Sequence, residues 1–237
     1  MKRSHEPRNR VFASSEESNA HRSDDDERAA QQEIRHEIRY SDELKRKALH
    51  LLALIIPLGI WPIGKTAAVI ILGGLAAVAL TADFLRVRSQ RFSAAIYRYF
   101  QFMMRPEECP PVGGPIVLNG ATWVILSATL LVAVFPLEIA ISSFTTFMIA
   151  DAAAAIVGRG IGRRHWRHTT RTVEGSSAFL VIGLAVMLLF GWTPFWISFL
   201  AVFAGTAAEI PSRPLNDNIR VPLVIAIVIY VLQYFSA

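Results

Sequence analysis

The sequence is poor in cysteine and, over most of its length, poor in acidic residues. Cys109 is the single cysteine among 237 residues, which excludes an intrachain disulfide. Of the 19 Asp and Glu residues, only eight follow residue 43. Hydrophobic residues make up 53% of the chain and the mean hydropathy is +0.38, which is too apolar for an ordinary soluble domain. The composition therefore indicates a membrane protein.

The first 43 residues differ from the rest of the chain. They lack an apolar stretch, which argues against a secretory signal, and they hold eight of the 24 Lys and Arg residues and 11 of the 19 acids. Low hydrophobicity with mixed charge predicts a disordered hydrophilic tail. We therefore expect a tail over residues 1–43 and a membrane domain over residues 44–237.

Seven apolar segments approach the length of about 20 residues that a spanning helix needs. They cover residues 44–61, 66–85, 117–135, 138–158, 174–192, 194–210 and 219–236. Breaks at Pro62, Pro136 and Pro194 leave tight turns, which favour antiparallel neighbours. Residues 92–104 are too short and too mixed to span, and we expect them in the membrane interface. The sequence predicts an all-α, polytopic membrane helix bundle of about seven transmembrane helices.

Basic residues concentrate in alternate loops between these segments, so nearly all of them fall on one predicted side of the membrane. One side carries Lys45, Arg46, Lys47, Arg86, Arg88, Arg91, Arg98, Arg105, Arg159, Arg163, Arg164, Arg167, Arg171, Arg213 and Arg220. The other side carries only Lys65. The positive-inside rule then predicts a cytoplasmic N-terminus and an external C-terminus, in the inner membrane if the source is prokaryotic. Orientation alone accounts for many of these arginines, so the net charge of +5 does not indicate a nucleic-acid partner.

Five acids of the membrane domain fall near the predicted cytoplasmic ends of spans. They are Asp83, Asp151, Glu174, Glu209 and Asp217. An acid at the centre of a span costs about 2.5–3.5 kcal/mol on insertion scales. Such acids can simply neutralise arginines, an explanation that applies most readily to Asp83. Asp151 is harder to explain in this way, because it lies inside an apolar run among small residues that let helices pack closely.

A loop rich in glycine and arginine follows Asp151. Its glycines and arginines alternate as Gly158, Arg159, Gly160, Gly162 and Arg163. Glycines let backbone amides approach phosphate oxygens, and arginines bind phosphate through two parallel hydrogen bonds. The pattern G-x-x-x-x-G-K-[ST] is absent, so this is not a P-loop. Thr172 or Ser176 is predicted to cap the next helix, whose N-terminus favours an anion. The segment predicts a polyphosphate site.

A polar stripe precedes the first span. Glu43, Arg46, Lys47 and His50 share one helix face. This pattern is compatible with a polar stripe entering the bundle, and also with function. In the functional interpretation Lys47 contacts phosphate, and His50 acts as a base or orients one.

Near the C-terminus, carboxylates bracket a proline-containing turn. Glu209 precedes the turn, and Asp217 and Asn218 follow it. Oxygen ligands of this kind suit Mg²⁺, which is commonly bound together with substrate phosphates. The sequence therefore offers Asp151, Glu209, Asp217 and Asn218 as candidate metal ligands.

Taken in order, these segments resemble the family of dolichol kinases, phytol kinases and CTP-dependent diacylglycerol kinases. The opening E-L-x-R-K-x-x-H block is matched by Glu43-Leu44, Arg46-Lys47 and His50. The D-x-x-x-A-x-x-G-R-x-x-G block is matched by Asp151, Ala155, Gly158-Arg159 and Gly162, and the K-S-x-E-G-S block by Arg171-Thr172, Glu174-Gly175 and Ser176. The closing E…D-N…P block is matched by Glu209, Asp217-Asn218 and Val221-Pro222. The resemblance covers residues 43–225, and its one notable departure is Arg171, which stands where the family usually has Lys.

The resemblance implies a membrane kinase that uses CTP with Mg²⁺ to phosphorylate a lipid alcohol, which could be a polyprenol such as dolichol, a phytol-like isoprenoid or diacylglycerol. The implied nucleotide-binding residues are Arg46, Lys47, Gly158, Arg159, Gly162, Arg163, Arg171, Thr172, Glu174, Gly175 and Ser176. Asp151, His50 and Glu209 are the implied catalytic residues. The expected partners are CTP, the lipid alcohol and the bilayer, and self-association into a homo-oligomer is compatible with the sequence.

Two other classes of protein stay open. Phosphatidate cytidylyltransferases share the two central blocks, but their later K-D, P-G-H-G-G and D-R-x-D signatures are missing here. A transporter would place ionisable residues near mid-membrane and show internal repeats. The acids of this chain gather at one predicted face instead, which favours the kinase.

Overall fold

The computed structural model describes residues 47, 48, 50–100, 104, 108–211 and 215–236. All of them belong to one unit, Arg46–Ala237. The tail predicted for residues 1–43 lies outside the described residues, and so do Glu43 and Arg46.

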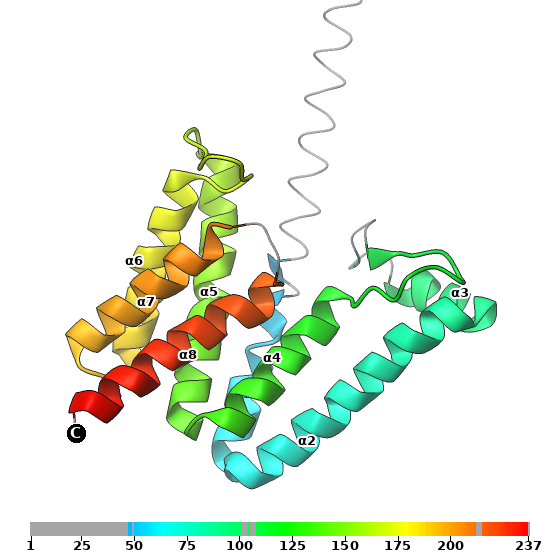
Figure 1. Ribbon diagram of the computed structural model, residues 1–237, viewed down its shortest axis with the longest axis horizontal. Coiled ribbons are helices and arrows are strands. Elements are labelled where there is room, and N and C mark those ends of the chain that lie inside the picture. Colours follow the sequence, from blue (N-terminus) through cyan, green and yellow to red (C-terminus); the bar gives the residue numbers. More distant parts are fainter. Residues whose placement is uncertain (1–46, 49, 101–103, 105–107, 212–214, 237) are drawn as a thin grey trace, which may run out of the picture. The chain divides into compact units, whose positions relative to one another are not determined.

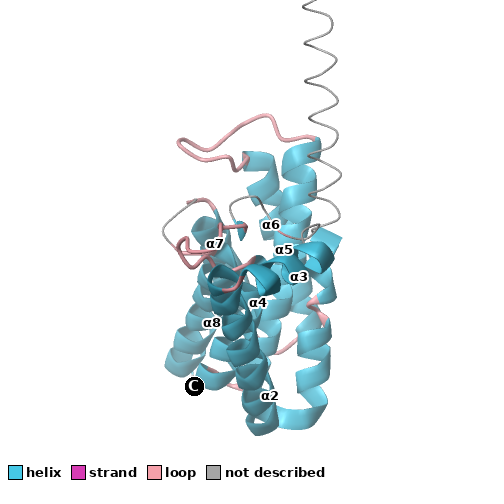
Figure 2. Ribbon diagram, turned by 90° about the vertical axis from the view of Figure 1, so that its right-hand side faces the viewer, coloured by secondary structure: helices cyan, strands magenta, loops and turns pink. Residues whose placement is uncertain are grey.

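The described part of the chain is helical (Figure 1). Its elements are α2 (Ile55–Arg88), α3 (Gln90–Phe100), α4 (Gly120–Val134), α5 (Leu137–Gly160), α6 (Val173–Phe190), α7 (Phe195–Glu209) and α8 (Asp217–Ser236). Helices and loops account for everything drawn in colour in Figure 2. An isolated bridge between His165 and Thr172 is the only β-type pairing among these residues. The predicted all-α membrane bundle is confirmed.

Four helices are long and apolar enough to cross a membrane: His50–Arg88, Leu137–Gly160, Val173–Phe190 and Asp217–Ser236. The protein is therefore an integral membrane protein. Helices α4 and α7 are apolar but have only 15 residues each, fewer than the segments predicted from the sequence. Local capping explains the later start of α4, because the side chain of Asn119 accepts a hydrogen bond from the Thr122 N–H at 3.0 Å.

The long first helix is broken near its beginning. Gly64 has φ 77° and ψ 170°, a conformation that glycine adopts readily and other residues avoid. The ribbon of α2 reverses direction at this level (Figure 1). The described part of the predicted segment 44–61 and the segment 66–85 thus lie on two arms, as expected, although the turn is at Gly64 and not at Pro62, which remains helical.

Helix α5 forms the centre of the bundle. It packs against α2, α4, α6 and α8. In its most apolar stretch 72% of the residues are buried, compared with 22% to 28% in the other three long helices. Those helices direct large apolar side chains outward, as at Ile70 and Leu189, which suits contact with lipid. Because Asp151 lies on α5, its carboxyl group is held inside the protein.

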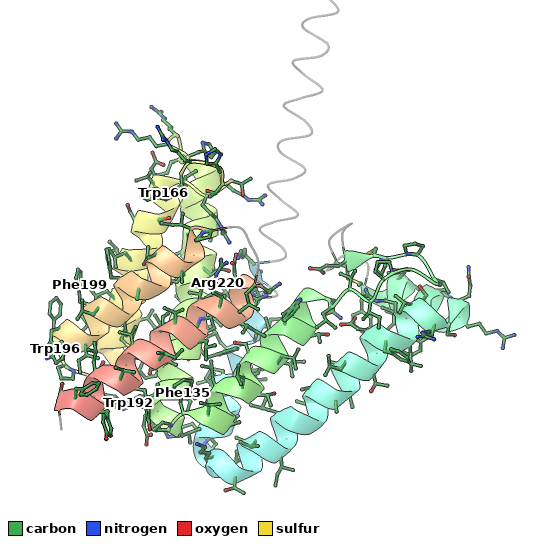
Figure 3. All side chains as sticks on the ribbon, viewed as in Figure 1. Phe135, Trp166, Trp192, Trp196, Phe199 and Arg220 are labelled. Atoms are coloured by element: carbon green, nitrogen blue, oxygen red, sulfur yellow. The ribbon has the colours of Figure 1, made fainter. Side chains whose placement is uncertain are left out.

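The two ends of the bundle differ in character. At one end, which we call the aromatic end, the Trp192 ring packs 4.8 Å from Trp61 and 4.7 Å from Phe190, measured between ring centroids. There too, Lys65 Nζ donates a hydrogen bond of 2.8 Å to the carbonyl oxygen of Phe135. Figure 3 shows Phe135 and Trp192 far from Trp166, with Arg220 between them; we call the end toward Trp166 and Arg220 the polar end. Tryptophan enrichment of this kind is typical of a membrane–water interface.

Candidate functional site

Asp151 is the buried centre of the polar end. Its side chain is 5% exposed and forms an ion pair with Lys47, which is 104 residues away in the sequence. His50 Nε2 lies 3.6 Å from Asp151 Oδ2, and the His50 ring meets Phe147 edge-on at 5.9 Å. Lys47 and His50, the two described members of the polar stripe predicted before the first span, therefore face Asp151. An isolated buried carboxylate would be costly, and Lys47 supplies the charge that stabilises it.

Arg171 joins the ends of two other helices. Its Nη1 forms an ion pair with Glu209 Oε1 at 2.8 Å, and its Nη2 donates a hydrogen bond to Asp217 Oδ2 at 2.5 Å. Glu209 ends α7 and is buried, whereas Asp217 begins α8, where a negative charge is favourable. Burial lowers the pKa of Arg171, but the nearby carboxylates of Glu209, Asp151 and Asp217 outweigh it and raise that pKa above its ordinary value. Arg171 is therefore a permanent cation in the site.

Arg220 completes this group and was assigned only a topological role from the sequence. It forms an ion pair with Asp217 and donates a hydrogen bond to the carbonyl oxygen of Pro211. The signal that could have revealed it is the spacing of three residues between Asp217 and Arg220, which puts the two side chains on one helix face. Asn218 lies half-buried beside Asp217, and its backbone N–H donates to the Asn216 side chain at 3.0 Å.

These side chains form one group with matched charges, which we call the polar cluster. The polar cluster comprises Lys47, Asp151, Arg171, Glu209, Asp217 and Arg220, with His50 beside Asp151. Three acidic side chains face three basic ones, Lys47, Arg171 and Arg220, so its formal charge is zero with His50 neutral. A phosphate group can enter such a cluster by replacing a carboxylate as the partner of a cation.

The predicted metal ligands do not make a self-contained metal centre. Within the described ranges, no group of three or more His, Cys, Asp or Glu side chains is arranged to hold an ion. Mg²⁺, however, is commonly bound by one or two carboxylates together with substrate phosphates. Glu209 and Asp217, which meet on the same guanidinium group, have the chemistry for such a partial site. They fit the ion only together with a phosphate-bearing substrate.

The loop between α5 and α6 is tied to the start of α6. Thr172 caps α6, because its Oγ1 accepts a hydrogen bond of 3.1 Å from the Gly175 N–H. Both oxygens of Glu174 accept from the backbone N–H of Arg164 at 3.3 Å. Of the two predicted caps, Thr172 is thus confirmed, whereas Ser176 lies inside the helix and is buried. Glu174 thus holds the loop, and its predicted nucleotide contact stays a prediction.

The arginines of this loop divide into two groups. Arg171 belongs to the polar cluster, whereas Arg159 and Arg163 have exposed side chains, Arg159 in the last turn of α5 and Arg163 in the loop itself. The predicted phosphate contacts of Arg159 and Arg163 therefore stay predictions.

The glycines permit close packing between the end of α5 and the start of α6. A Cβ atom at Gly158 would lie 2.9 Å from Thr172 Oγ1, and one at Gly175 would lie 2.9 Å from the Ala154 carbonyl oxygen. At Gly162 it would lie 2.1 Å from the Gly158 carbonyl oxygen, which is impossible without movement of the backbone. These contacts explain the glycines by packing, and their predicted approach to phosphate is a separate property that stays a prediction.

Two alanine substitutions test whether a glycine of this loop is required for packing. Gly162→Ala should lower the free energy of unfolding by about 1–3 kcal/mol, because the added methyl group overpacks the junction. Gly160→Ala is the matched control, since a Cβ atom there meets nothing within 4 Å. Thermal unfolding in detergent measures both. Equal stability of the two variants would contradict the packing explanation.

Asp83 belongs to a second buried polar group, on α2 and at the start of α4. It accepts hydrogen bonds from the Asn119 N–H at 3.0 Å, from Asn119 Nδ2 at 2.8 Å and from Thr122 Oγ1 at 2.7 Å. It also pairs with Arg86 at 3.0 Å. Arg86 in turn donates to the carbonyl oxygens of Glu108 and Val117, both at 2.7 Å. The explanation that Asp83 neutralises an arginine is therefore confirmed, and its oxygens are used in holding the fold together.

Two known proteins are similar to this chain over most of its length. An uncharacterized protein of Rickettsia prowazekii is 29% identical over 188 residues, which cover 76% of this chain and 90% of the relative. The CTP-dependent diacylglycerol kinase 1 of Schizosaccharomyces pombe is 28% identical over 213 residues, which cover 81% of this chain and 94% of the relative. No family model matches the chain, and no solved structure matches it. The distant similarity to a kinase suggests a related kinase family and gives loose support to a lipid kinase.

Proposed function

We propose that this protein is a membrane kinase that transfers the γ-phosphate of CTP to a lipid alcohol. The observation that supports the proposal best is the polar cluster. In it a buried Asp on the central helix pairs with Lys47 and acts electrostatically on Arg171, which pairs with Glu209 and Asp217. The distant similarity to a CTP-dependent diacylglycerol kinase supports the choice of CTP and puts diacylglycerol first among the lipids to test. Polyprenols and phytol-like isoprenoids follow.

Charge is the first requirement for binding a nucleoside triphosphate. Lys47 and Arg171 are each paired with carboxylates, and both can exchange these partners for phosphate oxygens. Arg171 already pairs two separate nitrogens with carboxylate oxygens, and the same two nitrogens can bind a phosphate group. Phosphoryl transfer depends mainly on positioning and on stabilising the charge that develops, so these cations would contribute to the rate as well as to affinity.

Magnesium would accompany the nucleotide, held by Glu209 and Asp217 with Asp151 and Asn218 nearby, and would neutralise charge on the phosphates. The chain's own residues have the remaining tasks. Asp151 and His50, which lie 3.6 Å apart and are largely buried, would accept the proton of the lipid hydroxyl group. The hydroxyl group would approach from within the bilayer.

The orientation belongs to the proposal as well. The polar end carries most of the basic side chains, and the positive-inside rule puts that end in the cytoplasm, where CTP is available. Residues 44–237 would then form the catalytic domain, with residues 1–43 as a non-catalytic tail.

Position-specific labelling tests the reaction. Purified protein in mixed micelles is given diacylglycerol, a polyprenol or phytol, together with Mg²⁺ and CTP labelled at either the α or the γ phosphate. Transfer of label into lipid from the γ position alone is the expected result. Transfer from the α position with release of pyrophosphate would instead identify a cytidylyltransferase. If neither label reached any of these lipids, nor a phosphatidate control, both reactions would be excluded. ATP labelled at the γ position serves as the control for nucleotide choice.

A further inference from the structure

Trp166 is held by two hydrogen bonds in the loop between α5 and α6. Its backbone N–H donates to the Arg171 carbonyl oxygen at 3.0 Å, beside the bridge between His165 and Thr172. Its indole Nε1–H donates to Ser176 Oγ at 3.1 Å. The first bond closes the loop onto the residue that enters the polar cluster, and the second fixes the indole ring on α6 (Figure 3).

Ser176 extends this connection to Glu209. The Ser176 side chain is buried, and its Oγ lies 3.5 Å from Glu209 Oε2. An indole N–H can only donate, so Ser176 Oγ accepts from it, and the one hydroxyl proton of Ser176 is left for Glu209. The other oxygen of Glu209 forms an ion pair with Arg171 Nη1 at 2.8 Å. Trp166 therefore reaches the Arg171–Glu209 pair twice, once through the backbone and once through Ser176.

A tryptophan in a basic loop could also lie at the membrane interface with no further role. An interfacial tryptophan directs its N–H toward water or lipid headgroups. The N–H of Trp166 is instead bonded to a buried serine, although the residue as a whole is 38% exposed. This geometry favours a role inside the site.

We propose that Trp166 is a positioning residue for the triphosphate, which keeps Ser176, Glu209 and Arg171 in the arrangement that receives the nucleotide. The inference rests on the proposed function and adds a residue outside the motifs that suggested it. Replacing Trp166 should therefore change the binding of the nucleotide and not that of the lipid. The reason is that the hydrogen bonds of Trp166 connect it to Arg171 and, through Ser176, to Glu209.

Trp166→Phe tests the inference, since it removes the N–H donor and keeps an aromatic ring. The KM for CTP should rise about three- to tenfold, as expected for the loss of one hydrogen bond, while the KM for the lipid alcohol and the melting temperature stay unchanged. Trp196→Phe is the matched control, because Trp196 is similarly exposed and lies at the aromatic end (Figure 3). It should change neither KM.

A double-mutant cycle with Ser176→Ala separates this role from a general effect on the loop. If Trp166 acts through Ser176, the double variant should bind CTP no more weakly than Ser176→Ala alone. Effects that multiply, or a wild-type KM for CTP in Trp166→Phe, would overturn the inference.

Equilibrium binding of labelled CTP accompanies the kinetics and needs no turnover. Failure of wild-type protein to transfer the γ-phosphate would sink the proposed function. If the wild-type protein binds CTP and Trp166→Phe binds it equally well, only the proposed role of Trp166 is wrong. A wild-type protein that bound no CTP would end both.

Discussion

Asp151→Asn is expected to lower the rate of phosphoryl transfer by a factor of about a thousand or more, which is the scale of losing one central electrostatic contact in an active site. Asn preserves the size of the side chain but removes the charge that pairs with Lys47 and lies beside His50. The measurement is transfer of the γ-label from CTP into lipid under saturating substrates. Circular dichroism and gel filtration in detergent show whether the protein remains folded.

The control for this prediction lies on the same helix. Glu138 is an exposed acid in the first turn of α5, at the opposite end from Asp151. Glu138→Gln removes the same charge from the same element and should leave transfer unchanged. A near-wild-type rate for Asp151→Asn would show that the polar cluster is a structural ion-pair network and not the site of catalysis.

The second large effect concerns stability. Asp83→Ala should lower the free energy of unfolding by about 3–5 kcal/mol, the usual cost of removing one partner of a buried ion pair. Arg86, which is 1% exposed, would lose its counter-ion, and Asn119 and Thr122 would lose their acceptor. Denaturant or thermal unfolding in detergent measures the change. The folded fraction should retain the wild-type KM for CTP.

Replacing both charged partners provides the control. Asp83→Leu combined with Arg86→Met leaves no unpaired charge and should recover part of the lost stability. If Asp83→Ala kept its stability and lost transfer, Asp83 would have to be reassigned to the catalytic site. We therefore expect substitution of Asp83 to lower mainly the stability, and substitution of Asp151 to lower mainly the rate of transfer.

The sequence was sufficient to predict the class of fold and to select several members of the polar cluster. Hydropathy alone identifies helices of this kind, since only a segment that satisfies its own backbone can cross the hydrocarbon core of a membrane. The few acids of the membrane domain were informative, because the charge of each carboxylate in an apolar segment has to be balanced by a polar or cationic partner. For this reason Asp151, Glu209 and Asp217 could be selected from composition and position before their partners were known.

The partners themselves depended on tertiary packing. Lys47 and Asp151 are 104 residues apart, and nothing local links Arg171 to Glu209 and Asp217. An apolar helix shows little sequence difference between its inner and outer faces in a bilayer, because the two surroundings are similarly apolar. The sequence therefore could not tell which helices meet or which cation neutralises which acid.

The packing role of Gly162 and the hydrogen bonds of Trp166 could also not be predicted from the sequence, because both depend on tertiary contacts. Whether a glycine serves packing or ligand binding depends on what lies across from it, and at Gly162 the neighbour is the backbone of Gly158. Trp166 gave no signal as a site residue, since its partner Ser176 meets it only after the loop folds back. The sequence by itself determined a helical membrane protein with costly acids at one predicted face. The tertiary structure decided how these acids are paired, because burial and charge compensation depend on contacts between helices.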